Sequence, residues 1–300
     1  MKKSIEFVAN TTIAAAILIA APLAVAQAEG ASNGTGQSGQ SIGIGIGLPS
    51  SAGRFSGLIG IGLGVAPDYE GSDRYGLTAL PLADIRYPGF LFIKGASVNP
   101  NDGLVSAGWN LLNVTYASGS GPRVRLSLGP FVRYRSGRDQ DDNDALKGLG
   151  DIDGSVSLGG FAELTAGPWS MEVNAAPEVT GGSDGVLVAF GARYTTKLSK
   201  DFDVSLGVSA SWANKDYMQG TFGVSATQAA RSGLARFNAS AGFKDVGADI
   251  RTSYALSESF SLVGQVGYRR LLGSADDSPI VNGTGSPHQF RAIVGIAVRF

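Results

Sequence analysis

An acidic loop is the first place in this sequence that could carry chemistry. The segment GRDQDDNDALKGLGDIDG brings several aspartates close together, and carboxylate oxygens are the ligands that Ca²⁺ prefers. An EF-hand loop that starts at Asp139 would need glycine at its sixth position and glutamate at its twelfth, but Asp144 and Gly150 stand there. The sequence therefore excludes an EF-hand. It leaves a divalent-ion site only as a minor alternative to solvated or arginine-paired carboxylates, with the candidate ligands Asp139, Asp141, Asp142 and Asp144.

A lone histidine is the second such place. His288 is the only histidine, and Ser278, Ser286, Asp276 and Asp277 lie near it in the sequence. A nucleophilic hydrolase needs the serine, the base and the acid in mutual contact. These residues instead fall on a loop with glycine and proline and without an oxyanion-hole signature. Cysteine is absent, which excludes thiol catalysis and disulfides. We therefore expect no catalytic residue, no cofactor and no enzyme activity.

The other charged residues sit within a period-two pattern that predicts β-strands. The segment DFDVSLGVSASW alternates apolar and polar residues from Asp201 onward, so its two faces differ in polarity. The same period recurs in RVRLSLGPFVRYR, DVGADIRTSYAL and QFRAIVGIAVRF. Runs of about 9–13 residues match tilted membrane strands, whereas soluble strands are shorter. Aromatic residues at both strand ends favour a membrane barrel over a soluble sandwich.

The connections set the expected strand number. Short turns, such as Tyr87-Pro88-Gly89 and Ser257-Glu258, alternate with long polar loops, as in outer-membrane barrels. If Asn99–Asp102 is a short outer loop and Ala117–Pro122 an inner turn, the chain has about twelve strands, and merging the irregular region Phe90–Tyr116 gives about ten. We therefore predict an all-β, antiparallel transmembrane β-barrel of about twelve strands, with ten as the alternative.

One face of each predicted strand lines the barrel interior, and this face carries the charges. They could form an ion-pair network that fills a narrow bore, or a cationic passage for small anions. A barrel of about twelve strands lies between filled and open barrels in size, and we favour a filled or narrowly conducting bore. The predicted lumen residues are Arg125, Arg133, Arg135, Glu163, Glu172, Arg193, Asp203, Asp245, Asp249, Arg251, Arg269, Arg291 and Arg299.

The N-terminal region predicts export. Lys2 and Lys3 precede an apolar run, and small residues follow it, which is typical of a signal peptide. Cleavage after Ala26 is expected, with Ala28 as the alternative. The predicted organisation is a signal peptide at 1–26, a Gly/Ser-rich flexible periplasmic tail at 27–54 and the barrel at 55–300. The tail segment SIGIGIG could pair as an edge strand. The net charge of -1 offers no basic field for nucleic acid.

Several loops carry a family resemblance. The strings APDYEGSDRY, GRDQDDNDALKGLGDIDG, WANKDYMQGTFGVSATQAARSGL, GFKDVG and RLLGSADDSPIV closely resemble the MipA/OmpV family. This resemblance implies an outer-membrane barrel in a Gram-negative envelope, surrounded by lipid and lipopolysaccharide. It also implies a scaffold that joins a lytic transglycosylase to a murein synthase, and other members are described as porin-like or adhesive. No catalytic residues follow from it. The final strand resembles the signal for the barrel assembly machinery through Val294, Ile296, Val298 and Phe300.

These observations lead to one functional expectation and two alternatives. We expect a non-enzymatic outer-membrane scaffold for peptidoglycan enzymes, with the tail from Gln27 to Arg54 as its docking element. The first alternative is a narrow porin-like channel for small solutes. The second is an adhesin that acts through the acidic loop and the loop Ala213–Arg236.

Overall fold

The protein is an antiparallel β-barrel. The computed structural model describes residues 40–47, 53–118 and 123–300. Twelve strands pair with their neighbours along the chain, and the pairing of the last strand, β14, with the first, β2, closes them into a ring, which confirms the predicted fold. The strands of the ring are β2 (Ser56–Pro67), β3 (Tyr75–Tyr87), β4 (Leu91–Lys94), β5 (Val105–Trp109), β7 (Val124–Arg135), β8 (Ser155–Ala166), β9 (Trp169–Thr180), β10 (Val186–Lys197), β11 (Phe202–Ala213), β12 (Gly242–Ala255), β13 (Phe260–Leu271) and β14 (His288–Arg299).

The alternation along each strand produces an apolar outer surface. Leu206 and Val208 of β11 are exposed, as are Val294 and Ile296 of β14. Exposed apolar side chains all round a closed barrel are compatible with lipid rather than water. Aromatic pairs mark both ends of the wall, for example Trp169 with Tyr194 at one end and Tyr268 with Phe290 at the other. No helix among the described residues is long and apolar enough to span a membrane.

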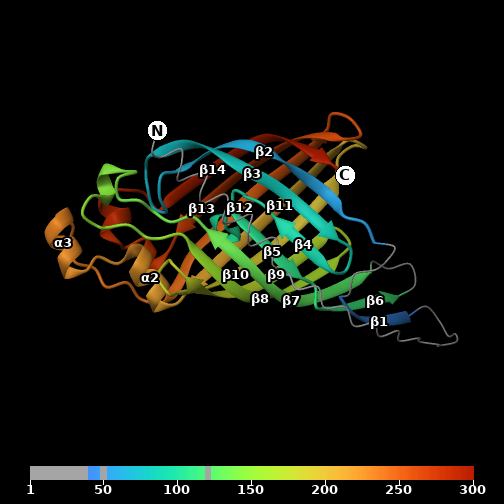
Figure 1. Ribbon diagram of the computed structural model, residues 1–300, viewed down its shortest axis with the longest axis horizontal. Helices are drawn as coiled ribbons and strands as arrows, with labels where there is room; N and C mark the ends of the chain where they lie inside the picture. Colours follow the sequence, from blue (N-terminus) through green and yellow to red (C-terminus); the bar gives the residue numbers. More distant parts are fainter. Residues whose placement is uncertain (1–39, 48–52, 119–122) are drawn as a thin grey trace.

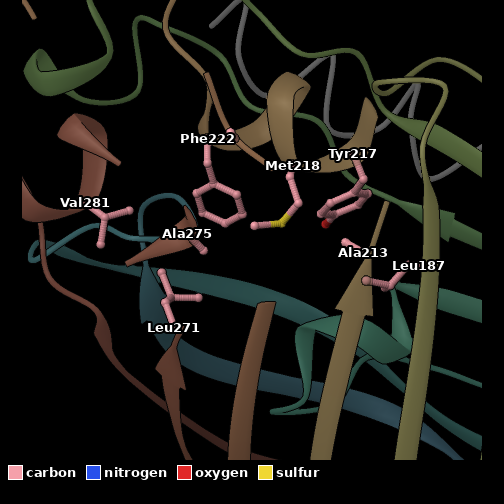
Figure 2. Packing of buried hydrophobic residues seen from close by; sticks show 9 residues of the cluster. Leu187, Ala213, Tyr217, Met218, Phe222, Leu271, Ala275 and Val281 are labelled. Carbon is pink, nitrogen blue, oxygen red and sulfur yellow. The ribbon is translucent and has the colours of Figure 1, made fainter. Parts of the chain in front are cut away.

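The long loops pack together as a cap over one end of the barrel (left in Figure 1). The loop after β11 holds the helices α2 (Lys215–Phe222) and α3 (Ala226–Ser232). Figure 2 shows Tyr217, Met218 and Phe222 pointing from α2 toward the strand ends, where they pack with Ala213 and Leu271. A second cluster joins Tyr69, Leu146, Leu149, Val224 and Ile280 from four different loops. The cap therefore has its own apolar core. Long loops mark the outer side of such barrels.

The segment between β4 and β5 lies inside the barrel. Strand β4 has only four residues, and a 3-10 helix follows at Pro100–Asp102. Val98 packs against inward-facing Leu82, Val263 and Ile293, and the amide of Asn101 donates to the carboxylate of Asp245 across the lumen. The expectation that Asn99–Asp102 forms an outer loop is therefore wrong. The alternation of apolar and polar residues does not distinguish a loop that points out of the barrel from one that folds into it. We call residues 95–104 the lumen segment.

Two further strands lie beside the ring. Strand β6 (Leu112–Ser118) continues β5 along β7, and β1 (Gln40–Ile46) pairs antiparallel with β6. Figure 1 shows both at the end opposite the cap, which is also the end where the C-terminus lies. Strand β1 falls within the predicted tail, and its pairing matches the suggestion that SIGIGIG forms an edge strand. The predicted signal peptide, both cleavage positions and most of the inner turn before β7 lie outside the described residues.

Candidate functional site

Burial of the ion pairs in the lumen rises steadily from the short-turn end to the cap. The side chains of Lys197 and Asp203 near the short turns are 70% and 40% exposed. The side chains of Arg193 on β10 and Asp249 on β12, which lie midway along the wall, are 24% and 7% exposed. Near the cap, Lys244 and Asp245 are fully buried. The lumen is thus open toward the short turns and closed toward the cap.

The closed end holds a buried ionic centre around Asp245. Lys244 Nζ lies 2.9 Å from one carboxylate oxygen of Asp245, and Arg269 bonds the other. Ser211 also donates to this carboxylate, at 2.7 Å. Lys244 forms a second ion pair with Glu70 from the loop after β2. With Asn101, the buried carboxylate has four donors, and the buried ammonium has two carboxylates, so the charges satisfy one another as burial of charge requires.

A β-bulge places Lys244 in this centre. Ser211 pairs with Asp245, but the next residue, Trp212, pairs with Phe243, so Lys244 has no partner on β11. A bulge leaves one extra residue and re-aims its side chain. Phe243 stays exposed on the outer wall while Lys244 and Asp245 both face inward. Strict alternation assigns Lys244 to lipid, and for this reason the sequence analysis missed it.

The cap is anchored to this centre through α2. Arg135 of β7 donates to the hydroxyl oxygen of Tyr217, and its guanidinium carbon lies 4.9 Å from the centre of the Tyr217 ring. Lys244 Nζ lies 5.7 Å from the same ring centre. Glu178 of β9 lies 4.0 Å from Arg135 and accepts bonds from Ser183 and Gly185 in the next loop. One tyrosine therefore joins the apolar core of the cap to the charged interior.

The lumen segment bonds both the buried centre and the middle of the wall. Arg269 Nη2 donates to Asn99 Oδ1 at 2.6 Å. Arg251 lies 3.3 Å from Asp102 and 3.0 Å from Asp249. Asp102 also accepts from the hydroxyl of Ser97 at 2.6 Å. These contacts attach the lumen segment to β12 and β13, so the segment links opposite sides of the barrel wall.

A further chain of polar contacts links β4, β9 and β7 inside the barrel. Lys94 Nζ lies 3.2 Å from Glu172, whose other oxygen accepts from Asn174. Arg133 in turn donates to Asn174 at 2.6 Å. Phe92, Phe131 and Phe161 fill the space beside this chain of bonds. Arg86 and Asp84 form an exposed pair at 2.9 Å near the short turns.

The remaining predicted lumen residues take different places. Arg125 is exposed and Glu163 is half-buried, at the open half of β7 and β8. Arg299 donates to the carbonyl of Ser257 in a short turn. Arg291 lies beside a cavity with Glu70 and Arg269. Residues that the sequence analysis missed came from loops, from the bulge, from the short strand β4, from the end of β9, or from uncharged positions; they are Glu70, Lys94, Asn99, Asn101, Asp102, Asn174, Glu178 and Lys244.

The acidic loop forms local contacts instead of a ligand cluster. Asp144 lies 2.6 Å from Lys147 and 3.7 Å from Arg74, and the hydrogen bond from Lys147 holds the pKa of Asp144 below its usual value. Asp139 accepts from the backbone amide of Asp141 at 2.7 Å. Within the described residues, no group of three or more acidic or histidine side chains lies close enough to hold a metal ion.

The serines around His288 have partners of their own. Buried Ser278 donates to the carbonyl of Phe222 at 2.6 Å. The ring of His288 contacts the hydroxyl of Tyr268 at 2.7 Å and the guanidinium of Arg270 at 3.1 Å. Arg270 also bonds Asp276 at 3.0 Å. The structure therefore places Ser278 in the core of the cap and His288 on the outer rim of the wall.

The predicted assembly residues lie on the strand that closes the barrel. Val294, Ile296 and Val298 of β14 pair with Leu63, Ile61 and Ile59 of β2. The backbone amide and carbonyl of Phe300 exchange bonds with Gly57 at 3.2 Å and 3.1 Å. The C-terminal strand thus joins the two ends of the wall, and recognition by an assembly machinery stays a prediction.

Solved structures similar to this chain include outer-membrane proteins. They include OmpT of Vibrio cholerae, with 10% identity over 85% of this chain and 100% of that chain at a TM-score of 0.33. The NanC porin has 10% identity over 81% and 100% of the two chains at 0.37. An outer-membrane channel from Pseudomonas putida F1 has 14% identity over 85% and 97% at 0.38. A comparison with curated proteins gives no match.

A match to a protein-family model shows which family this chain belongs to. The model described as MltA-interacting protein MipA matches residues 59–300, which includes every strand of the ring apart from the first residues of β2, together with all of the cap. The closed wall, the apolar outer surface and the aromatic ends agree with an outer-membrane location. This outer-membrane β-barrel therefore belongs to the MipA family, as the resemblance in its loops predicts.

Proposed function

We propose that this protein is a non-enzymatic outer-membrane scaffold that docks periplasmic enzymes of murein synthesis and hydrolysis. The observation that carries the proposal is the match of residues 59–300 to a family described by its interaction with MltA. The partners would be a lytic transglycosylase and a murein synthase, which the loop resemblance implies. We also expect lipopolysaccharide and the barrel assembly machinery as partners, as for other outer-membrane barrels.

The architecture of the lumen supports docking over transport. A solute that enters from the short-turn end meets the lumen segment, then the buried pair Lys244–Asp245, then the cap. Passage would have to separate fully buried charges and an apolar core at the same time, and each of these is costly to disrupt. The channel alternative therefore needs a large rearrangement that docking does not need.

Affinity purification from crosslinked envelopes tests the proposal. The full chain, including the predicted signal peptide, carries an affinity tag in one outer loop and is crosslinked in living cells. We expect murein hydrolases and synthases among the recovered proteins at levels well above those for an unrelated tagged barrel of the same membrane. Recovery equal to that of the unrelated barrel would contradict the scaffold.

A conductance measurement tests the channel alternative in parallel. The purified protein is inserted into planar lipid bilayers, and the current is recorded at increasing voltage. We expect no stepwise conductance above the baseline. Regular steps from the unmodified chain would show an open bore and favour transport.

A further inference from the structure

Strand β1 has one edge that faces away from β6. Among the residues that the structure describes, β1 forms a ladder with β6 alone. Its sequence QSIGIGI has neither a charge nor a proline. Natural edge strands are protected from further pairing by lysine, proline, a bulge or a covering element. Strand β1 lacks the protective residues, so its outer edge can accept another strand.

The register shows which backbone groups point to this edge. The amide of Gly47 donates to the carbonyl of Leu111 at 2.9 Å, and Ile46 pairs with Leu112. In an antiparallel ladder, bonded and non-bonded residues alternate. The odd-numbered residues therefore bond β6, and the backbone amides of Ile42, Ile44 and Ile46 point to the open edge.

The side chains of β1 leave this edge accessible. Ile42, Ile44 and Ile46 share one face and are 70%, 73% and 67% exposed. On the other face, a methyl group added at Gly43 or Gly45 would meet no atom nearer than 3.9 Å and 4.0 Å. The strand thus presents an apolar row on one face and bare backbone on the other.

The position of β1 determines which compartment can reach it. The indole nitrogen of Trp109 donates to the carbonyl of Gly47 at 2.6 Å, and Asn113 donates to the carbonyl of Gly89 in the short turn after β3. Strand β1 starts with Gln40 beside Ser118 at the far end of β6, opposite the cap, and runs from there toward Gly47 (Figure 1). Short turns mark the periplasmic side, so the open edge faces periplasmic partners.

We propose that the open edge of β1 binds an uncharged, extended segment of a periplasmic protein, which adds to the sheet as one more strand. Backbone bonds to Ile42, Ile44 and Ile46 supply the pairing, and apolar side chains of the segment cover the isoleucine row. This inference rests on the proposed scaffold function and names the surface at which docking occurs.

A second copy of this chain does not fit the same edge. Two barrels in one membrane share their direction along the membrane normal, so β1 runs toward the cap side in both. Rotation about the normal preserves that direction and reverses the sideways tilt. Strands tilted by about 35–45° would then cross at roughly 70–90° and could not form a ladder. The partner is therefore a different protein, free to approach with its own strand direction.

Matched variants in β1 separate backbone pairing from side-chain contact. Ile44→Pro removes an amide that points to the open edge, and proline is tolerated at such positions of edge strands. Ile44→Ala shortens the side chain but keeps this amide. A photo-crosslinking residue at Ile42 reports the neighbour in living cells. The same residue at Ile61, which is 66% exposed on β2, is the control for a wall position without an open edge.

We expect an adduct with a periplasmic protein at position 42 and none at position 61. Its yield should fall by about tenfold with Ile44→Pro and by less than about twofold with Ile44→Ala, because the backbone bonds dominate strand addition. The inference is overturned by a dimer of this chain, by the absence of an adduct, or by an adduct that Ile44→Pro leaves unchanged. If murein enzymes are still recovered in the affinity experiment while Ile44→Pro has no effect, only the inference fails. If none is recovered from the unmodified chain, the scaffold itself fails.

Discussion

The two ends of the lumen use the same residue types in opposite ways. At the periplasmic end, Lys197 and Asp203 form an ion pair at 2.7 Å that water still reaches. Below the cap, Lys244 and Asp245 form one at 2.9 Å with no exposure. An exposed pair contributes little to stability, whereas a buried charge that loses its partner destabilises strongly. The difference indicates that the cap end is the rigid part of this barrel and the periplasmic end is the accessible part.

Replacing one aspartate at each end of the lumen should give the largest difference in stability. Asp245→Ala leaves Lys244 and Arg269 buried without their shared carboxylate, and we expect a loss of about 3–5 kcal/mol in the free energy of unfolding. Asp203→Ala should cost less than about 1 kcal/mol because Lys197 is exposed. Urea unfolding in detergent, followed by the mobility of the folded barrel in gels, measures both. Equal losses would mean that burial does not distinguish the two ends.

Truncation inside the cap should come next in size. Met218 is fully buried in the apolar cluster below α2, and Met218→Ala should destabilise the cap by about 2–5 kcal/mol. Met171→Ala on the lipid-facing wall is the control, since Met171 is 53% exposed. Protease added outside intact cells should cut the loop between β11 and β12 in the first variant alone. A resistant Met218→Ala cap would show that the loops do not depend on this core.

Two serines on one strand allow a direct comparison of accessibility. Ser205 and Ser211 both face the lumen on β11, but Ser211 is fully buried and bonds Asp245. The natural chain has no cysteine, so Ser205→Cys and Ser211→Cys each introduce one thiol. A polar thiol reagent added from the periplasmic side should label the first about a hundredfold faster, because the second requires local opening. Similar rates would contradict a lumen that is closed near the cap.

The smallest effect should come from the surface of the cap. The hydrogen bond from Lys147 holds the pKa of Asp144 below its usual value, so the folded carboxylate is favoured above the unfolded pKa of about 3.9. This contribution is lost as the pH falls through the lower, folded pKa. Protease resistance of the outer loops should therefore drop slightly with Asp144→Asn at pH 7. The variant and the natural chain should become equal in strong acid, and a difference that persists there would have another cause.

The wall could be predicted from the sequence because its pattern is local. Alternation in β11 and β14 needs only neighbouring residues, and lipid on one side makes each outward position apolar. The twelve-strand ring and the family followed from this pattern and from the loop strings. The same alternation places the charges of β12 and β13 on one face of these strands, with Asp249, Arg251 and Arg269 as examples.

The interior could not be predicted because its contacts join distant parts of the chain. Asn99 meets Arg269, and Glu70 meets Lys244, across 170 and 174 residues. A repeating pattern in the sequence gives no information about contacts between residues so far apart. The lumen segment looks like a loop in sequence because asparagine, proline and aspartate favour turns wherever they occur. Only the closure of the ring decides that this turn points inward.

The extra residue in β12 has a consequence for how such a chain can change. Without an unpaired position at Lys244, every residue of β12 on the cap side of Asp245 would exchange lipid for lumen, and Phe243 would enter the interior. Point substitutions can alter the charge of this centre one side chain at a time. Deletion of a paired residue of β12 instead shifts the frame of the strand beyond it, so we expect variation within this wall to conserve the length of its paired segments more strictly than their composition.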